Sequence, residues 1–142
     1  MPSAVLPSLA LLPGPWMALP PEATLTVQAA GFRDSRGQAV AKLFRPGENV
    51  RGRGHWEQAA PIREGQAQFR FPGLEPGAYA GVDFHDPNGH GVMDHQPLLR
   101  LPSEPLGFSN GFSLGLLSGP PTFENLRFEL AGPGRSLDIP VE

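Results

Sequence analysis

Apolar and polar residues alternate with a period of two along several short segments of this chain. The pattern is clearest over residues 24–29, 66–71, 78–85, 126–130 and 137–141. Successive side chains of a β-strand point to opposite faces, so this period predicts strands that bury one face. No segment shows the wider period of an amphipathic helix. The pattern therefore predicts an all-β protein.

The segment at residues 78–85 is expected to be a central strand. It follows a Pro-Gly pair at residues 76–77, which combines a fixed φ with a residue that accepts positive φ and so favours a tight turn. Alternation places three apolar side chains on the core face, namely those of Ala80, Val82 and Phe84. Asp83 and His85 would then point the other way.

The remaining segments are assigned from the same pattern and from turn residues. Residues 38–44 are predicted to form a strand, although the pattern leaves its buried face open. Residues 46–60 are expected to form a loop, 61–63 a short strand, and 131–135 a hairpin loop between the last two strands. Residues 97–121 are expected to form a long irregular loop.

Glycine and proline number 18 each among 142 residues, and these breakers separate about seven predicted strands. Many short strands joined by Gly/Pro turns are typical of a sandwich or a barrel. A chain of this length can bury the core of one domain. We therefore predict a single antiparallel β-sandwich over residues 23–142.

Composition excludes several function classes. The formal net charge is -3 and there is no cysteine. The chain has no basic cluster of the kind that contacts nucleic acid, so no nucleic-acid partner is expected. Without cysteine there is no disulfide scaffold, no thiolate zinc site and no thiol catalysis.

Residues 1–22 are expected to stand apart from the sandwich. The run at residues 4–19 is largely apolar but is broken by Pro7, Pro13 and Pro15, so it is not expected to span a membrane. A secretory signal lacking basic residues and a proline-rich N-terminal extension both stay open. The first alternative predicts a periplasmic or secreted protein.

A glycine-rich loop follows the central strand. Asp86, Asn88, Val92 and Asp94 occupy the positions at which a calcium-binding loop supplies side-chain or backbone oxygens. They form the candidate metal site, with Ca²⁺ as the candidate ion. Position five of the loop is His90 and position twelve is proline, which predicts weak binding. A metal-free turn is the alternative, because Asp, Asn and Gly also stabilise turns on their own.

Other residues near this loop suggest further chemistry. His85, His90 and His95 together could bind zinc or copper through imidazole nitrogen. Ser109 with a histidine and a carboxylate such as Glu124 would be the residues of a small hydrolase, but no nucleophile motif surrounds the serine. We therefore expect no catalytic residues and no bound organic cofactor.

Three blocks of the sequence resemble a bacterial family, domain-of-unknown-function family 2141. Residues 86–94 are similar to its D-x-N-G-N-G-x-x-D motif, residues 107–110 to its G-F-S-N-N, and residues 119–125 to its G-P-P-x-F-E-[DN]. The Gly-Ala-Tyr turn at residues 77–79 also agrees, and His90 departs where the family has asparagine. The resemblance implies an exported transthyretin-like or immunoglobulin-like sandwich without an assigned activity.

Together these observations predict a non-catalytic exported module that binds a protein partner or small ligand through loops. The residues expected on that loop surface are His85, His90, Phe108, Ser109, Asn110 and Glu124. A purely structural envelope domain is the alternative, and a small hydrolase is the third. The partner, the oligomeric state and the pathway stay open.

Overall fold

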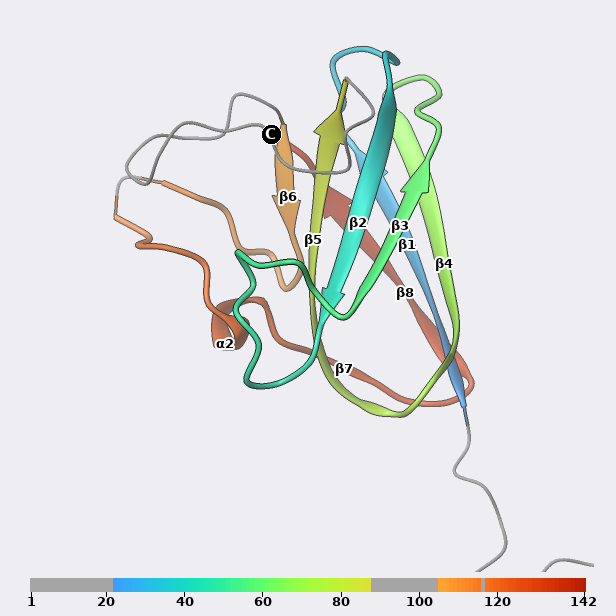
Figure 1. Cartoon of the computed structure of the whole chain (residues 1–142), viewed down its shortest axis with the longest axis vertical. Coiled ribbons are helices and arrows are strands. Elements are labelled where there is room, and N and C mark those ends of the chain that lie inside the picture. The colour runs from blue at the N-terminus through green and yellow to red at the C-terminus, as the bar shows by residue number, and fades with distance from the viewer. Residues whose placement is uncertain (1–21, 88–104, 116) are drawn as a thin grey trace, which may run out of the picture.

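The structure is a computed structural model that describes residues 22–87, 105–115 and 117–142 (Figure 1). These residues form eight strands and one short helix in the order β1 (Ala23–Ala30), β2 (Gln38–Phe44), β3 (Trp56–Ala60), β4 (Gln66–Leu74), β5 (Gly77–Asp86), β6 (Leu106–Phe108), α2 (Phe123–Leu126), β7 (Phe128–Leu130) and β8 (Gly134–Pro140). In this part of the chain no helix is long and apolar enough to cross a membrane.

The strands form two sheets that pack face to face (Figure 1). One sheet has the order β4-β1-β8, and the other has the order β3-β2-β5-β6, with β7 also paired to β5. The predicted β-sandwich is confirmed. Its strictly antiparallel arrangement is wrong at one pair, because β8 runs parallel to β1.

The last two strands are not the predicted hairpin. β7 pairs with the start of β5 in one sheet, whereas β8 pairs with β1 in the other. Residues 131–133 therefore cross between the sheets. Alternation reveals that each segment is a strand, but it carries no information about which strand lies beside it.

The main core lies between the sheets. Leu25, Val27 and Ala29, the apolar positions of the alternating segment 24–29, pack there from β1, and each is almost fully buried. Phe69 and Phe71 reach the same layer from β4. Burying such large apolar side chains stabilises the folded state by roughly 1.5–3 kcal/mol each.

A second core covers the outer face of the larger sheet. It contains residues from β2, β5, β6, α2 and the connection between β2 and β3, namely Phe44, Val50, Ala80, Val82, Phe108, Phe123 and Leu126. β5 is therefore buried on both faces, and so is most of β2. The sequence pattern did not indicate which face of residues 38–44 is buried, and the structure shows that both faces are covered.

The two-sided burial of β5 corrects one prediction. Ala80 and Val82 face the second core, while Tyr79 faces the core between the sheets. Asp83 and His85 share the face of Tyr79 by alternation and are only 1% and 3% exposed. The face of Ala80 and Val82 is thus buried as expected, but in the second core. The face of Asp83 and His85, which was expected to point away from the core, lies between the two sheets.

Two segments predicted as irregular contain strands. Residues 56–60 form the edge strand β3 instead of the end of a loop, and residues 106–108 form β6 within the expected long loop. β3 alternates only between half-buried and exposed positions. β6 has three residues, which is too short for a period to be recognised.

Candidate functional site

The glycine-rich motif begins where β5 ends, at Asp86. This residue pairs with Gln38 of β2 in the antiparallel ladder, and its side chain is 1% exposed. Gln38 Nε2 donates to Asp86 Oδ2 over 3.4 Å. The first oxygen-bearing side chain of the motif is therefore held at a fixed point on the edge of the protein interior.

The loop between β1 and β2 packs directly on this strand end. Gly37 has a φ of +63°, and a Cβ there would lie 2.2 Å from the backbone oxygen of Asp86. Only glycine permits both the positive φ and this close approach. The loop is itself ordered by Asp34, whose Oδ1 accepts from the backbone nitrogen of Arg36 at 2.9 Å.

Electrostatics strengthen that loop. The Arg36 guanidinium donates to both carboxylate oxygens of Asp34 over 3.2 Å. These hydrogen bonds, with the backbone bond, lower the pKa of Asp34. Asp34 therefore stays ionised at neutral pH, at the rim of the same end of the sandwich.

His85 lies beneath this loop and belongs to the interior. Its Nε2 donates to the carbonyl oxygen of Arg36 at 2.7 Å, since a carbonyl can only accept. The ring packs edge-on against Phe32 at 5.9 Å between centroids, and Nε2 lies 3.8 Å from Asp34 Oδ1. The prediction of His85 on a loop surface is wrong, because the β1–β2 loop covers it.

Several predicted site residues lie outside the described part of the chain. They are Asn88, His90, Val92, Asp94 and His95. Within residues 22–87, 105–115 and 117–142, no group of three His, Asp or Glu side chains is placed to hold a metal ion. Both metal hypotheses rest on the sequence, with Asp86 and His85 as their described members.

Ser109 and Phe108 are also interior residues. The Ser109 hydroxyl donates to the backbone oxygen of Leu126 at 2.5 Å and accepts from the backbone nitrogen of Gly81 at 2.9 Å. Ser109 is 1% exposed, and Phe108 belongs to the second core. Their prediction as loop-surface residues is wrong, because both close the second core at the end of β6.

Asn110 and Glu124 are exposed. The Asn110 side chain donates to the backbone oxygen of Asn125 at 3.3 Å, which ties the turn after β6 to α2. Glu124 forms an ion pair of 3.5 Å with Arg127. Thr122 caps the start of α2, because its side chain accepts from the backbone nitrogen of Asn125. The blocks at residues 107–110 and 119–125 of the sequence are therefore in direct contact, through the hydrogen bond from Asn110 to Asn125.

Sequence reasoning missed the most unusual group, Asp83. Its neighbours in the adjacent strands are Ala41 and Gly107, both small. Its Oδ2 is buried and has no hydrogen-bond partner among the described residues. Burial raises the pKa of Asp83 well above the ordinary value of an aspartate. A carboxylate between apolar residues in a strand buried on both faces is the signal that could have identified it.

Comparison with known proteins gives one match. A family model described as "Uncharacterized protein conserved in bacteria (DUF2141)" matches residues 27–138. No curated protein and no solved structure matches the chain.

Proposed function

This chain belongs to the bacterial family DUF2141, and we propose a non-catalytic binding role for it. The protein is an exported, periplasmic or secreted β-sandwich module, and cell fractionation checks the export. It binds a ligand or protein partner through the loops at the end of the sandwich where β5 ends. A weak Ca²⁺ site in the 86–94 segment stiffens that end.

The position of Asp86 carries this proposal. A hard cation needs oxygen ligands on a backbone that is already ordered. Asp86 is the first such ligand of the motif, and the β1–β2 loop packs on its backbone through Gly37. The sequence then supplies the oxygens of Asn88, Val92 and Asp94 at calcium-loop spacing.

The proposal that the protein is not an enzyme is supported by the hydrogen bonds of Ser109 and His85, the described nucleophile and base of the hydrolase hypothesis. Both polar functions of Ser109 are engaged with backbone groups of Gly81 and Leu126. His85 Nε2 is engaged with Arg36. A nucleophile and its base would have to break these bonds before they could react.

A calcium titration tests the proposal. With a Kd on the order of 10⁻⁴ to 10⁻³ M, calcium at ten times Kd adds about 1.4 kcal/mol to the free energy of unfolding. For a domain of this size that raises the Tm by about 3–6 °C. Differential scanning calorimetry with and without CaCl₂, at constant ionic strength, measures the shift.

Matched variants locate the ion. Asp86→Asn and Asp94→Asn should each abolish the calcium-dependent shift, because each removes a charged ligand. Asp138→Asn removes an exposed aspartate of β8 and should leave the shift unchanged. An equal shift in all three variants, or no shift in the unmodified chain, would refute the calcium site.

A purely structural envelope domain is the second candidate. The bonds from His85 to Arg36 and from Gln38 to Asp86 hold this end with protein groups alone. Under this alternative, calcium and magnesium leave the Tm unchanged, and Asp94→Asn alters stability equally with and without the ion.

A further inference from the structure

β8 is the outer strand of the three-stranded sheet and has a partner on one side only. The nitrogen of Thr24 donates to the oxygen of Pro133 at 3.0 Å, and the nitrogen of Val141 donates to the oxygen of Ala30 at 2.7 Å. Pro133 and Val141, which flank β8, are both odd-numbered, so the odd-numbered residues of β8 direct their N–H and C=O groups to β1.

The even-numbered residues face the open side, because the direction of the peptide groups alternates along a strand. Gly134, Ser136 and Asp138 thus direct both N–H and C=O away from β1. All three are exposed, and none of these peptide groups has a partner among the described residues. Pro140 ends the row, since it has no N–H.

The same edge already accepts an antiparallel strand at its far end. Leu106 donates to the oxygen of Glu142 at 2.9 Å, and Glu142 donates to the oxygen of Leu106 at 3.1 Å. This reciprocal pair aligns β6 antiparallel to the direction of β8. A further strand along Asp138, Ser136 and Gly134 would continue the line of β6 past its last residue.

The edge of β4, on the opposite side of the same sheet, is protected in a way that β8 is not. The Gln58 side chain donates to the oxygen of Arg70 at 2.5 Å and accepts from its nitrogen at 3.2 Å. Arg63 pairs with Gln66 in an isolated bridge, and Pro72 has no N–H to offer. These contacts occupy backbone groups along the edge of β4, whereas the peptide groups of Gly134, Ser136 and Asp138 on β8 have no partner among the described residues.

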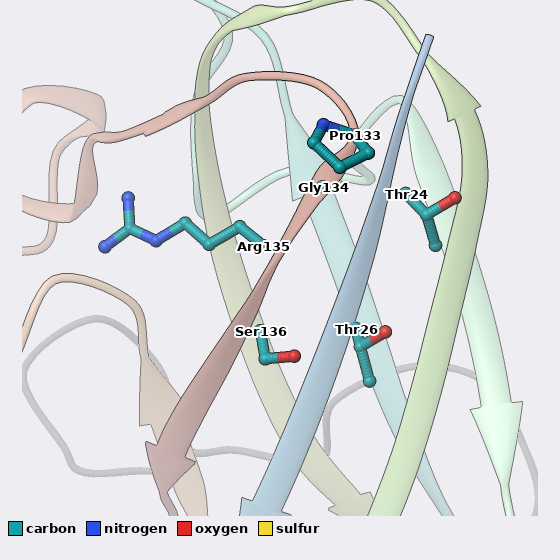
Figure 2. Close-up of a pocket in the computed structure, with 6 residues that line it drawn as sticks. All are labelled: Thr24, Thr26, Pro133, Gly134, Arg135 and Ser136. Carbon is teal, nitrogen blue, oxygen red and sulfur yellow. The ribbon is translucent and has the colours of Figure 1, made fainter.

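A shallow, open hollow lies beside the start of β8. It has a volume of about 310 Å³ and is lined by Thr24, Thr26, Pro133, Gly134, Arg135 and Ser136 (Figure 2). Gly134 lies so close to β1 that a Cβ there would be 2.3 Å from the oxygen of Thr24. Position 134 therefore has no room for a side chain. An aromatic side chain on a neighbouring strand can cover such a glycine.

We propose that the free edge of β8 binds an extended peptide segment of a partner protein by antiparallel β-strand addition. The segment places an aromatic side chain opposite Gly134, over the hollow, and pairs its backbone with Ser136 and Asp138. The start of β8, with Gly134 and the hollow, lies at the end of the sandwich away from the end of β5 (Figure 1). It is independent of the proposed calcium site.

A designed peptide tests the proposal on the full chain. The probe is acetyl-Lys-Thr-Val-Thr-Val-Thr-Phe-Thr-Lys-amide with a fluorescent label, and anisotropy measures its binding. In the proposed register, phenylalanine lies opposite Gly134 and the valine two residues earlier lies opposite Ser136. N-methylation of that valine should weaken binding about tenfold or more, because it removes a hydrogen bond to β8. N-methylation of the threonine between them should leave binding within about twofold, because its N–H points to solvent.

Protein variants provide the second half of the test. Ser136→Pro removes an N–H from the open edge and leaves the bonds to β1, so peptide binding should weaken about tenfold. Ser136→Thr keeps the N–H and should bind as the unmodified chain does. If Ser136→Pro does not fold by circular dichroism, Asp138→Pro takes its place on the same edge.

Three results would overturn the proposal. The first is no binding at millimolar peptide, and the second is equal binding by the proline and threonine variants. The third is occupation of the edge by this chain itself. That result would appear as self-association that Ser136→Pro abolishes, or as tighter peptide binding when residues 1–21 are deleted.

Discussion

Ser109 is buried beside β5 and Asp83 is buried within it, yet only the polar atoms of Ser109 are fully hydrogen-bonded. Ser109 joins three elements, because its hydroxyl bonds backbone groups of β5 and α2 while the residue itself follows β6. Asp83 lies in β5 and has one oxygen without a partner. Both are 1% exposed, so burial alone does not distinguish them. A buried polar group stabilises a fold only where the fold supplies its partners.

The largest expected effect comes from removing the satisfied group. Ser109→Ala leaves the nitrogen of Gly81 and the oxygen of Leu126 without their partner inside the second core. We expect it to lower the free energy of unfolding by about 2–4 kcal/mol, since each unsatisfied buried group costs about 1–3 kcal/mol. Urea denaturation measures the change. Ser113→Ala, at an exposed position, is the control and should change stability by less than about 0.5 kcal/mol.

Asp83 should reveal itself through pH. Its pKa is raised in the folded state by burial, so the folded protein holds this proton more tightly than the unfolded chain. The contribution to stability is complete below the unfolded pKa of about 3.9 and is lost as pH rises through the folded pKa. The unmodified chain should therefore lose up to about 1.4 kcal/mol per pH unit in that window relative to Asp83→Asn.

Urea denaturation of both proteins at several pH values between 4 and 8 supplies the difference curve. Subtracting the two curves removes the titration of the histidines, which both proteins share. Ser113→Ala, an exposed change that involves no ionisable group, should give a flat difference. A flat difference for Asp83→Asn as well would show that Asp83 is not a buried acid with a raised pKa.

A smaller effect is expected at Tyr79, which combines features of both residues. Its hydroxyl donates to the backbone oxygen of Glu75 at 2.6 Å, and burial is the main reason that its pKa is raised. Tyr79→Phe removes one hydrogen bond and leaves the ring between Trp56 and Phe128. We expect a loss of about 1 kcal/mol in thermal or urea unfolding. A loss as large as that of Ser109→Ala would contradict this ranking.

The sequence predicts the strands whose apolar and polar residues alternate, but it does not predict which strands pair with one another. β1 and β2 were predicted almost to the residue, because Leu25, Val27 and Ala29 alternate and residues 38–44 lie between turn residues. β3 was missed, since an edge strand with half-buried residues buries too little to show a period. The parallel pairing of β8 depends on which strand lies beside it, and no local pattern records that.

The start of the glycine-rich motif was predicted in its place along the fold, but the packing around it was not. The motif starting at Asp86 was correctly placed at the end of the central strand. The burial of His85 depends on a loop about fifty residues earlier in the chain, which covers it through Arg36. Likewise, Ser109 resembled a loop residue because its partners, Gly81 and Leu126, are both distant in sequence.

The burial of β5 on both faces has a consequence for how this protein can change. In a strand with one wet face, a slip of one residue exposes its apolar side chains to water. In β5 the same slip would exchange two interiors, moving Asp83 toward Phe123 and Leu126 and Val82 toward the space between the sheets. The residues of one core would leave voids or clash if they were placed in the other core, because both are closely packed. Insertions and deletions should therefore accumulate in the connections, while the length of β5 stays fixed.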